Sequence, residues 1–185
     1  MTAEEKLRSI TLAPYLIKAT ALIGEARSVG GNQFRHAFAT LGILLDYKYF
    51  SNSVLLKAAL VHDLFEDIPD TDRNALIDLD ADGYKVTQLV LEVTKHADES
   101  KANYLKRVLE SGSKNAKTLK VADRISNLTD INRSIFTKSK ISRYLDETEK
   151  YVIPMAEQVN ADMVIELRDL IKSRRLMAQT RMWGR

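Results

Sequence analysis

Apolar residues recur at three- and four-residue spacing along almost the whole chain, which is the periodicity of amphipathic helices. Interruptions are few, because the chain has only seven glycines and three prolines, and no segment predicts a strand with any clarity. Thr2 and Glu5 have the spacing of a capping box that begins a first helix. Further helices are predicted over residues 12–27, 32–45, 53–67, 72–79, 83–93, 100–109, 116–128, 139–159 with an interruption at Pro154, and 161–177.

The segment that follows Ser53 is apolar on nearly all sides of a helix, which predicts a position in the centre of the fold. The helix before it is expected to turn Phe34, Phe38, Leu41 and Leu45 inward. No internal repeat, linker or low-complexity segment interrupts the pattern. We therefore expect one all-α domain over residues 1–185, a multi-helix bundle whose core covers about 12–177.

Composition narrows the function classes. The net charge of +3 is too small to argue for a nucleic-acid partner, and no apolar run approaches the roughly 18 residues of a membrane span. The chain has no cysteine, which excludes disulfide and thiolate chemistry and favours a cytoplasmic location. The basic end, 172–185, is expected to be a solvated helix end, with a phosphate-contacting or oligomer-forming tail as the alternative. We expect a monomer or a homodimer.

Two histidines and two aspartates are dispersed along the helices in the order H…HD…D: His36, the pair His62-Asp63, and Asp123. Burying such groups in an apolar core is costly unless they are paired or bind a metal. Two imidazoles and two carboxylates suit Mn²⁺, Fe²⁺, Co²⁺ or Zn²⁺. The set predicts a metal site that leaves coordination positions for substrate and water, as metal-assisted hydrolysis requires.

Glu66 and Asp67 follow one turn after the HD pair, so His62 and Glu66 are expected on one stripe of a continuous helix and Asp67 beside them. This placement predicts that the two carboxylates handle protons beside the metal. The alternative is that both form ordinary salt bridges.

Other polar signals are weaker. The spacing of Asp78, Asp80 and Asp82 imitates the start of a calcium loop, but the position where that loop needs a glutamate holds Leu89. His96 is expected at the surface or behind the metal ligands. Lys120, Arg124 and Arg133 are basic residues on or after the helix of Asp123, and each is either solvated or a contact for substrate phosphate.

At these residues the chain resembles the HD-domain superfamily, and more closely the hydrolase domain of the RelA/SpoT homologues and their stand-alone small alarmone hydrolases. The matching segments are AALVHDLFED at 58–67, VTK at 93–95, NYL at 103–105, LKVADRISNL at 119–128 and DINR at 130–133. Their order and approximate spacing agree over most of the chain, and the VTK and KxADRxxN motifs are not general HD features.

The resemblance implies an all-helical fold, one Mn²⁺ ion or another divalent metal per chain, and removal of the 3′-pyrophosphate of a purine alarmone. The reaction type is that of a guanosine-3′,5′-bis(diphosphate) 3′-diphosphatase. It further implies that Arg27 packs on the purine base and that Asn127 contacts the sugar. Another HD-type phosphohydrolase, acting on deoxynucleotides or nucleoside monophosphates, and a non-catalytic nucleotide-sensing module are the alternatives.

The chain departs from the family pattern around the first histidine and after Asn127. The usual P-Y-I-x-H-P surroundings of the histidine are replaced by GNQFRHAF at 31–38, and Thr129 stands where an arginine is usual. The metal ligands match while the nucleotide contacts differ. Either a guanosine or an adenosine alarmone, (p)ppGpp or (p)ppApp, is therefore expected as the substrate.

Overall fold

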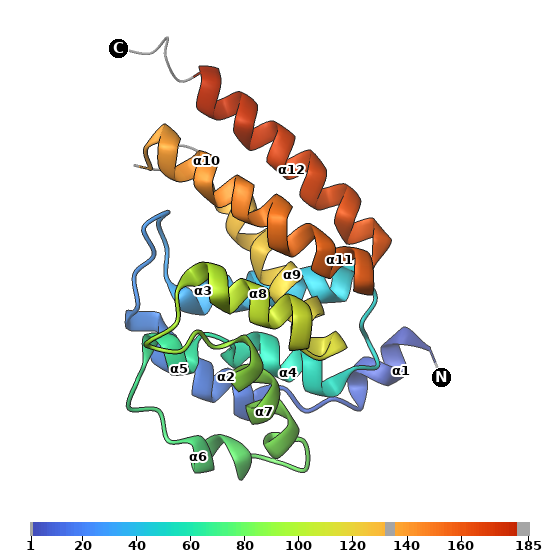
Figure 1. Ribbon diagram of the computed structural model, residues 1–185. Coiled ribbons are helices and arrows are strands. Elements are labelled where there is room, and N and C mark those ends of the chain that lie inside the picture. Colours follow the sequence, from blue (N-terminus) through green and yellow to red (C-terminus); the bar gives the residue numbers. More distant parts are fainter. Residues whose placement is uncertain (1, 132–135, 181–185) are drawn as a thin grey trace.

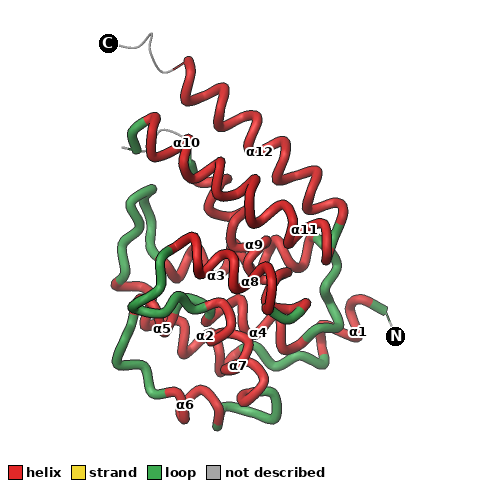
Figure 2. Tube along the Cα trace, viewed as in Figure 1, coloured by secondary structure: helices red, strands yellow, loops and turns green. Residues whose placement is uncertain are grey.

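The computed structural model describes residues 2–131 and 136–180, which form helices joined by short loops (Figures 1 and 2). The elements are α1 (Ala3–Arg8), α2 (Ala13–Ala19), the 3₁₀ helix η1 (Thr20–Gly24), α3 (Gln33–Asp46), α4 (Ser53–Val61), α5 (Leu64–Asp67), α6 (Arg73–Ile77), α7 (Gly83–Val93), α8 (Lys101–Ser111), α9 (Lys114–Asp130), α10 (Lys138–Glu147), the π turn η2 (Thr148–Val152), α11 (Ile153–Val159) and α12 (Ala161–Thr180). Within these described ranges there is no strand, so the all-α prediction is confirmed.

Local capping explains where many of these helices begin. Thr2 accepts the backbone N–H of Glu5 in the predicted capping box, and Ser100 caps α8 as expected. Asn32 caps α3 through the backbone N–H of Arg35. The cap of α4 is Asn52, so the prediction of Ser53 was wrong by one residue. Each cap satisfies a backbone N–H that has no partner inside its helix.

Helix α4 lies in the centre of the fold, as its apolar pattern predicts. Every residue from Leu55 to Val61 is buried, because α2, α3, α7 and α9 pack around the helix. Helix α9 connects this bundle to the C-terminal helices α10, α11 and α12, since it also packs against α11 and α12 (Figure 1). The long helix α9 therefore carries side chains from the core of the bundle to the space beneath α10.

Four sequence predictions need correction. Residues 12–27 are not one helix, because α2 gives way to a 3₁₀ turn that ends at Gly24. Of the four α3 residues predicted to face inward, Leu41 is buried and Phe34 and Leu45 pack partly buried against the core, but Phe38 is exposed. The other buried residues of α3 are His36, Ala37, Thr40 and Leu44. The segment 53–67 is interrupted at His62 and Asp63, between α4 and α5. The helix 139–159 changes to the π turn η2 at residues 148–152 and not at Pro154, which lies in the first turn of α11 directly after the π turn.

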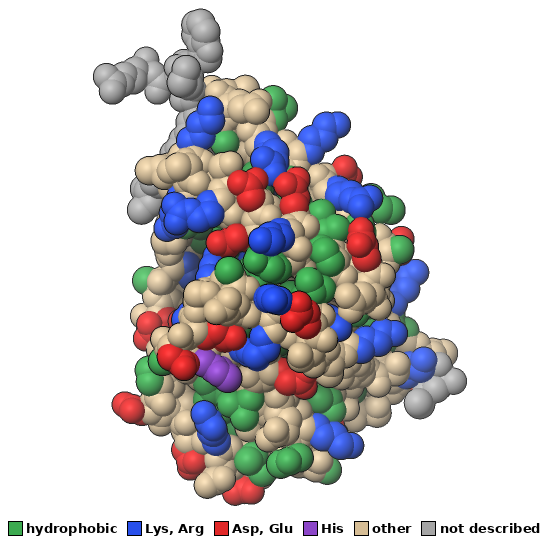
Figure 3. Space-filling model, in the orientation of Figure 1, with side chains coloured by type: hydrophobic (Ala, Val, Ile, Leu, Met, Phe, Trp, Pro, Cys, Tyr) green, Lys and Arg blue, Asp and Glu red, His purple; other side chains and the backbone are tan. Residues whose placement is uncertain are grey.

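The structure also bears on the predictions about membranes, surface charge and calcium. No helix of the described residues is both long and apolar enough to cross a membrane. On the face shown in Figure 3, basic and acidic side chains are interspersed. Two of the three aspartates of the calcium-like segment are already paired, because the buried ammonium of Lys57 lies 2.7 Å from both Asp80 Oδ2 and Asp82 Oδ2.

Candidate metal centre and substrate cavity

Three elements bring the four predicted metal ligands together. His36 comes from α3, Asp123 from α9, and the pair His62-Asp63 from the break between α4 and α5. His36 Nε2 lies 3.0 Å from Asp123 Oδ1 and 3.7 Å from Asp63 Oδ2, and His62 Nε2 lies 3.2 Å from Asp63 Oδ2. Ligands at about 2.1 Å from one ion lie roughly 3 Å apart when they are adjacent. The spacing of these atoms therefore suits a single metal ion.

Hydrogen bonds at the Nδ1 atoms of both imidazoles orient the rings so that their Nε2 atoms face Asp123. His62 Nδ1 lies 2.8 Å from the carbonyl oxygen of Ala59, so Nδ1 carries the proton that this contact requires. His62 Nε2 is buried and forms no hydrogen bond within the part of the chain that the structure describes, and its contact with Asp63 at 3.2 Å is an ion-pair contact. His36 Nδ1 lies 2.9 Å from Ser126 Oγ. A buried ring nitrogen that forms no hydrogen bond is what a metal would satisfy, so His36, His62 and Asp123 form a group that fits a metal ion.

The charges around this group are strongly coupled. Burial lowers the pKa of His62, but the Asp63 and Asp123 carboxylates outweigh it and raise the pKa to about 9. Burial likewise opposes the ionised form of Asp123, yet Lys120 and the two histidines hold its pKa well below the usual range. Lys120 Nζ contacts Asp123 Oδ2 at 2.6 Å. Asp123 is thus an anion that shares one oxygen with Lys120 and turns the other toward the histidines.

Glu66 and Asp67 lie beside the group but face different partners. Glu66 lines the cavity, and its Oε1 accepts a hydrogen bond of 2.6 Å from the backbone N–H of Lys95. Asp67 Oδ2 accepts a hydrogen bond of 2.8 Å from the side chain of Gln33. Burial and the neighbouring Asp63 raise the pKa of Asp67 to about 6. Neither carboxylate forms a salt bridge within the described part of the chain, although each accepts a hydrogen bond from a neutral donor.

Arg27 and Asn127 are joined to the metal group by hydrogen bonds. Asn127 Nδ2 donates to Asp123 Oδ1 at 2.5 Å, and Asn127 Oδ1 accepts from Arg27 Nη2 at 2.7 Å. Arg27 Nη1 is also ion-paired with Asp130. These contacts fix the guanidinium in the wall of the cavity with only 7% of its side chain exposed.

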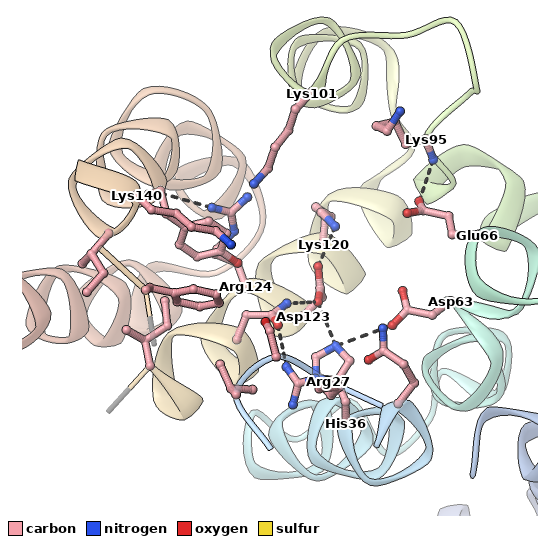
Figure 4. Close-up of a pocket in the computed structure, with 18 of the residues that line it drawn as sticks. Arg27, His36, Asp63, Glu66, Lys95, Lys101, Lys120, Asp123, Arg124 and Lys140 are labelled. Atoms are coloured by element: carbon pink, nitrogen blue, oxygen red, sulfur yellow. Dashed lines mark hydrogen bonds and ion pairs between the residues drawn. The ribbon is translucent and has the colours of Figure 1, made fainter. Parts of the chain in front are cut away.

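A cavity of about 640 Å³ opens from the metal ligands toward α10. Figure 4 shows Asp63 and His36 at one end, with Lys101, Lys120, Arg124 and Lys140 around the remaining space. Arg124 is only 2% exposed, and its Cζ lies 4.0 Å from the centre of the Tyr144 ring. Its Nε forms no hydrogen bond with any of the described residues. Aromatic and aliphatic side chains complete the far end: Ile131, Phe136, Ile141 and Tyr144. The cavity therefore has one end where the His/Asp group could hold a metal ion and another end that is cationic and partly apolar.

The comparisons with known proteins agree with this geometry. No protein-family model matches the chain. A Mycoplasma pneumoniae protein named as a probable guanosine-3′,5′-bis(diphosphate) 3′-pyrophosphohydrolase is 32% identical over 136 residues, which are 64% of this chain but only 18% of that protein. The human and mouse guanosine-3′,5′-bis(diphosphate) 3′-pyrophosphohydrolases MESH1 are 28% identical over 153 residues, 80% of this chain and 83% of theirs. A solved structure of a metazoan SpoT orthologue, which hydrolyses ppGpp, superposes with a TM-score of 0.76 at 25% identity, covering 88% of this chain and 94% of that one.

In sequence and in fold the chain is similar to RelA/SpoT-type HD-domain hydrolases.

Within this RelA/SpoT-type fold, the structure brings most of the predicted site residues to one cavity. His36, Asp63, Glu66 and Asp123 line it, together with Arg27, Lys120, Arg124 and Asn127. Asp67 is turned to Gln33, His96 is exposed, and the predicted phosphate contact Arg133 lies outside the described residues. Thr129, the departure after Asn127, is exposed and donates its hydroxyl to the carbonyl of Ile125.

The sequence analysis did not predict several residues of this site. Four further residues line the cavity: Lys95 from the segment between α7 and α8, Lys101 from the start of α8, and Lys140 and Tyr144 from α10. Ser126 and Gln33 contact the site through side-chain hydrogen bonds to His36 and Asp67. The VTK motif was a signal for Lys95, whereas the contacts of Ser126 and Gln33 have no local sequence signature.

Proposed function

We propose that this protein is a metal-dependent pyrophosphohydrolase that removes the 3′-pyrophosphate of a purine alarmone, (p)ppGpp or (p)ppApp. The observation that carries the proposal is a metal-ligand group at the end of a cavity lined by several cations. A nucleotide with phosphate chains at both its 3′ and 5′ positions has the charge that such a cavity neutralises. The curated relatives act on guanosine-3′,5′-bis(diphosphate), which supports the same substrate class here.

In this proposal His36, His62, Asp63 and Asp123 hold one divalent ion, Mn²⁺ in the first instance. When bound, the ion supplies a Lewis acid that polarises a phosphate and makes nearby water more acidic. Glu66, which faces the cavity beside Asp63, accepts a proton from the attacking water, with Asp67 next to it. The oxygen of the water forms a bond to the phosphorus that is attached to the 3′ oxygen. The bond between this phosphorus and the 3′ oxygen breaks, so pyrophosphate leaves and the 3′ oxygen takes a proton to become a hydroxyl.

The remaining cavity residues are assigned to the nucleotide. The guanidinium plane of Arg27 is held by Asp130 and Asn127, so it is ready to stack on a purine. Asn127 is proposed to contact the sugar, and Lys120, Arg124 and Arg133 the phosphates. Arg124 supports this role best, because it is a buried cation for which no described carboxylate lies within ion-pair distance.

The test is a substrate panel with the metal removed and restored. The purified protein is stripped with a chelator, reloaded with Mn²⁺, and given ppGpp, ppApp, deoxynucleoside triphosphates and nucleoside monophosphates. Pyrophosphate release confined to the 3′-pyrophosphorylated nucleotides supports the proposal. Phosphate release from monophosphates, or triphosphate release from deoxynucleotides, identifies another HD phosphohydrolase and rejects it. Binding of ppGpp or ppApp without turnover identifies a sensing module.

We also propose that residues 1–185 act as one domain in the cytoplasm, as a monomer or a homodimer. The net charge of only +3 is consistent with a small-molecule partner. Light scattering coupled to gel filtration measures the oligomeric state directly.

A further inference from the structure

Gln33 bridges the helix of a metal ligand and the helix of a proposed proton acceptor. It is the first residue of α3, one turn before His36, and its Nε2 donates to Asp67 Oδ2 of α5 at 2.8 Å. Its backbone N–H donates to the carbonyl of Glu25 at 2.9 Å, so the main chain is anchored as well. Gln33 is thus held by one hydrogen bond from its backbone N–H and another from its side-chain nitrogen.

The amide oxygen of Gln33 differs from its nitrogen. Gln33 Oε1 is buried and accepts no hydrogen bond from residues 2–131 or 136–180, although Gln33 lines the cavity together with His36, Asp63 and Glu66. A buried amide oxygen without a donor is unfavourable, so such an atom indicates a group that binds there. An amide oxygen can only accept, so the group that binds it must be a donor. A water molecule can donate to Gln33 Oε1 and to a carboxylate at once.

We propose that Gln33 is a positioning residue that orients the attacking water. Its Nε2 holds the Asp67 carboxylate in place, and its Oε1 accepts one hydrogen of the water while a carboxylate accepts the other. The lone pair of that water is then directed away from these acceptors, toward the end of the cavity where the phosphate binds. This inference rests on the proposed hydrolysis, because it assigns a role in the same reaction.

The bond to Gln33 also affects the charge of Asp67. Three other carboxylates act on Asp67, those of Asp63, Glu66 and Glu25, and together with burial they favour its protonated form. The Gln33 hydrogen bond opposes them and lowers the pKa of Asp67. Loss of Gln33 is therefore expected to raise the Asp67 pKa above about 6.

The test compares Gln33→Leu with Gln88→Leu, a matched control because Gln88 is exposed on α7 and does not line the cavity. In Gln33→Leu we expect kcat to fall about 10- to 100-fold, as positioned proton transfer is lost, with KM changed less than about twofold. Metal content, measured by elemental analysis, should equal that of the wild type. In metal-free protein, carboxyl-carbon NMR titration should show the Asp67 pKa raised in Gln33→Leu and unchanged in Gln88→Leu.

Two results would overturn the inference. A wild-type kcat in Gln33→Leu would show that the amide does not position the water. A rise in KM for only one of ppGpp and ppApp, with kcat unchanged, would show that Gln33 contacts the base instead. If the wild-type protein releases no pyrophosphate from either nucleotide, the proposed function fails and this role fails with it, whereas an active wild type with a normal Gln33→Leu rejects this inference alone.

Discussion

Raising the pH of the metal-free protein should destabilise it through His62. This imidazole is 3% exposed, and the Asp63 and Asp123 carboxylates outweigh burial to raise its pKa from 6.5 to about 9. A pKa that is higher in the folded state means that the folded protein holds the proton more tightly than the unfolded chain. The resulting stabilisation is fully present below pH 6.5 and is lost as the pH rises through about 9.

The size of the effect follows from the gap between the two pKa values. At 1.36 kcal/mol per pH unit, the free energy of unfolding should fall by roughly 3 kcal/mol between pH 6 and pH 9.5. For a chain of this length, about 3 kcal/mol corresponds to a decrease in Tm of roughly 6–12 °C. The measurement is thermal unfolding followed by circular dichroism, on chelator-treated protein. His62→Gln is the control, because it removes this titration while other groups titrate as before.

The same proton competes with the metal. If His62 Nε2 is a ligand, binding of Mn²⁺ at pH 7.5 should release roughly one proton per ion, and the apparent affinity should rise with pH up to about 9. Calorimetric titration in buffers of different ionisation enthalpy counts that proton. Parallel pH dependence of Tm in the wild type and His62→Gln, or metal binding without proton release, would refute the reasoning.

Three further predictions concern residues around the site and the core. Ser126→Ala removes the hydroxyl 2.9 Å from His36 Nδ1, so metal affinity should fall about 10-fold in a competition titration against a chelator; an unchanged Kd would separate Ser126 from the metal site. Arg27→Leu removes the guanidinium held by Asp130 and Asn127, so steady-state kinetics should show KM raised about 10-fold with a smaller change in kcat, and an unaltered KM would argue against base stacking. Lys57→Met leaves Asp80 and Asp82 without their buried cation, so chemical denaturation should show about 3 kcal/mol less stability with kcat retained; wild-type stability would show that the network is not structural.

The sequence by itself determined the helical class and indicated which residues could form a metal site. Helical periodicity and caps such as Thr2 and Ser100 depend on residues within a few positions of one another, so they can be seen in the chain. The HD pair and the VADRxxN segment are likewise local patterns. They were sufficient to place His36, His62, Asp63 and Asp123 in one hypothesis, and the structure brings these residues together.

Only the tertiary structure decided which polar atoms meet and which face of each helix is buried. Gln33 and Asp67 are 34 positions apart, and His36 and Ser126 are 90 apart, so no local pattern links either pair. Helical spacing says that residues share a face, but the neighbouring helices decide whether that face is covered, which is why Phe38 is exposed while Thr40 is buried. The break between α4 and α5 at His62 and Asp63 also has no local signal in the sequence. In the folded protein Asp63 contacts His36 of α3, and His62 contacts Asp123 of α9.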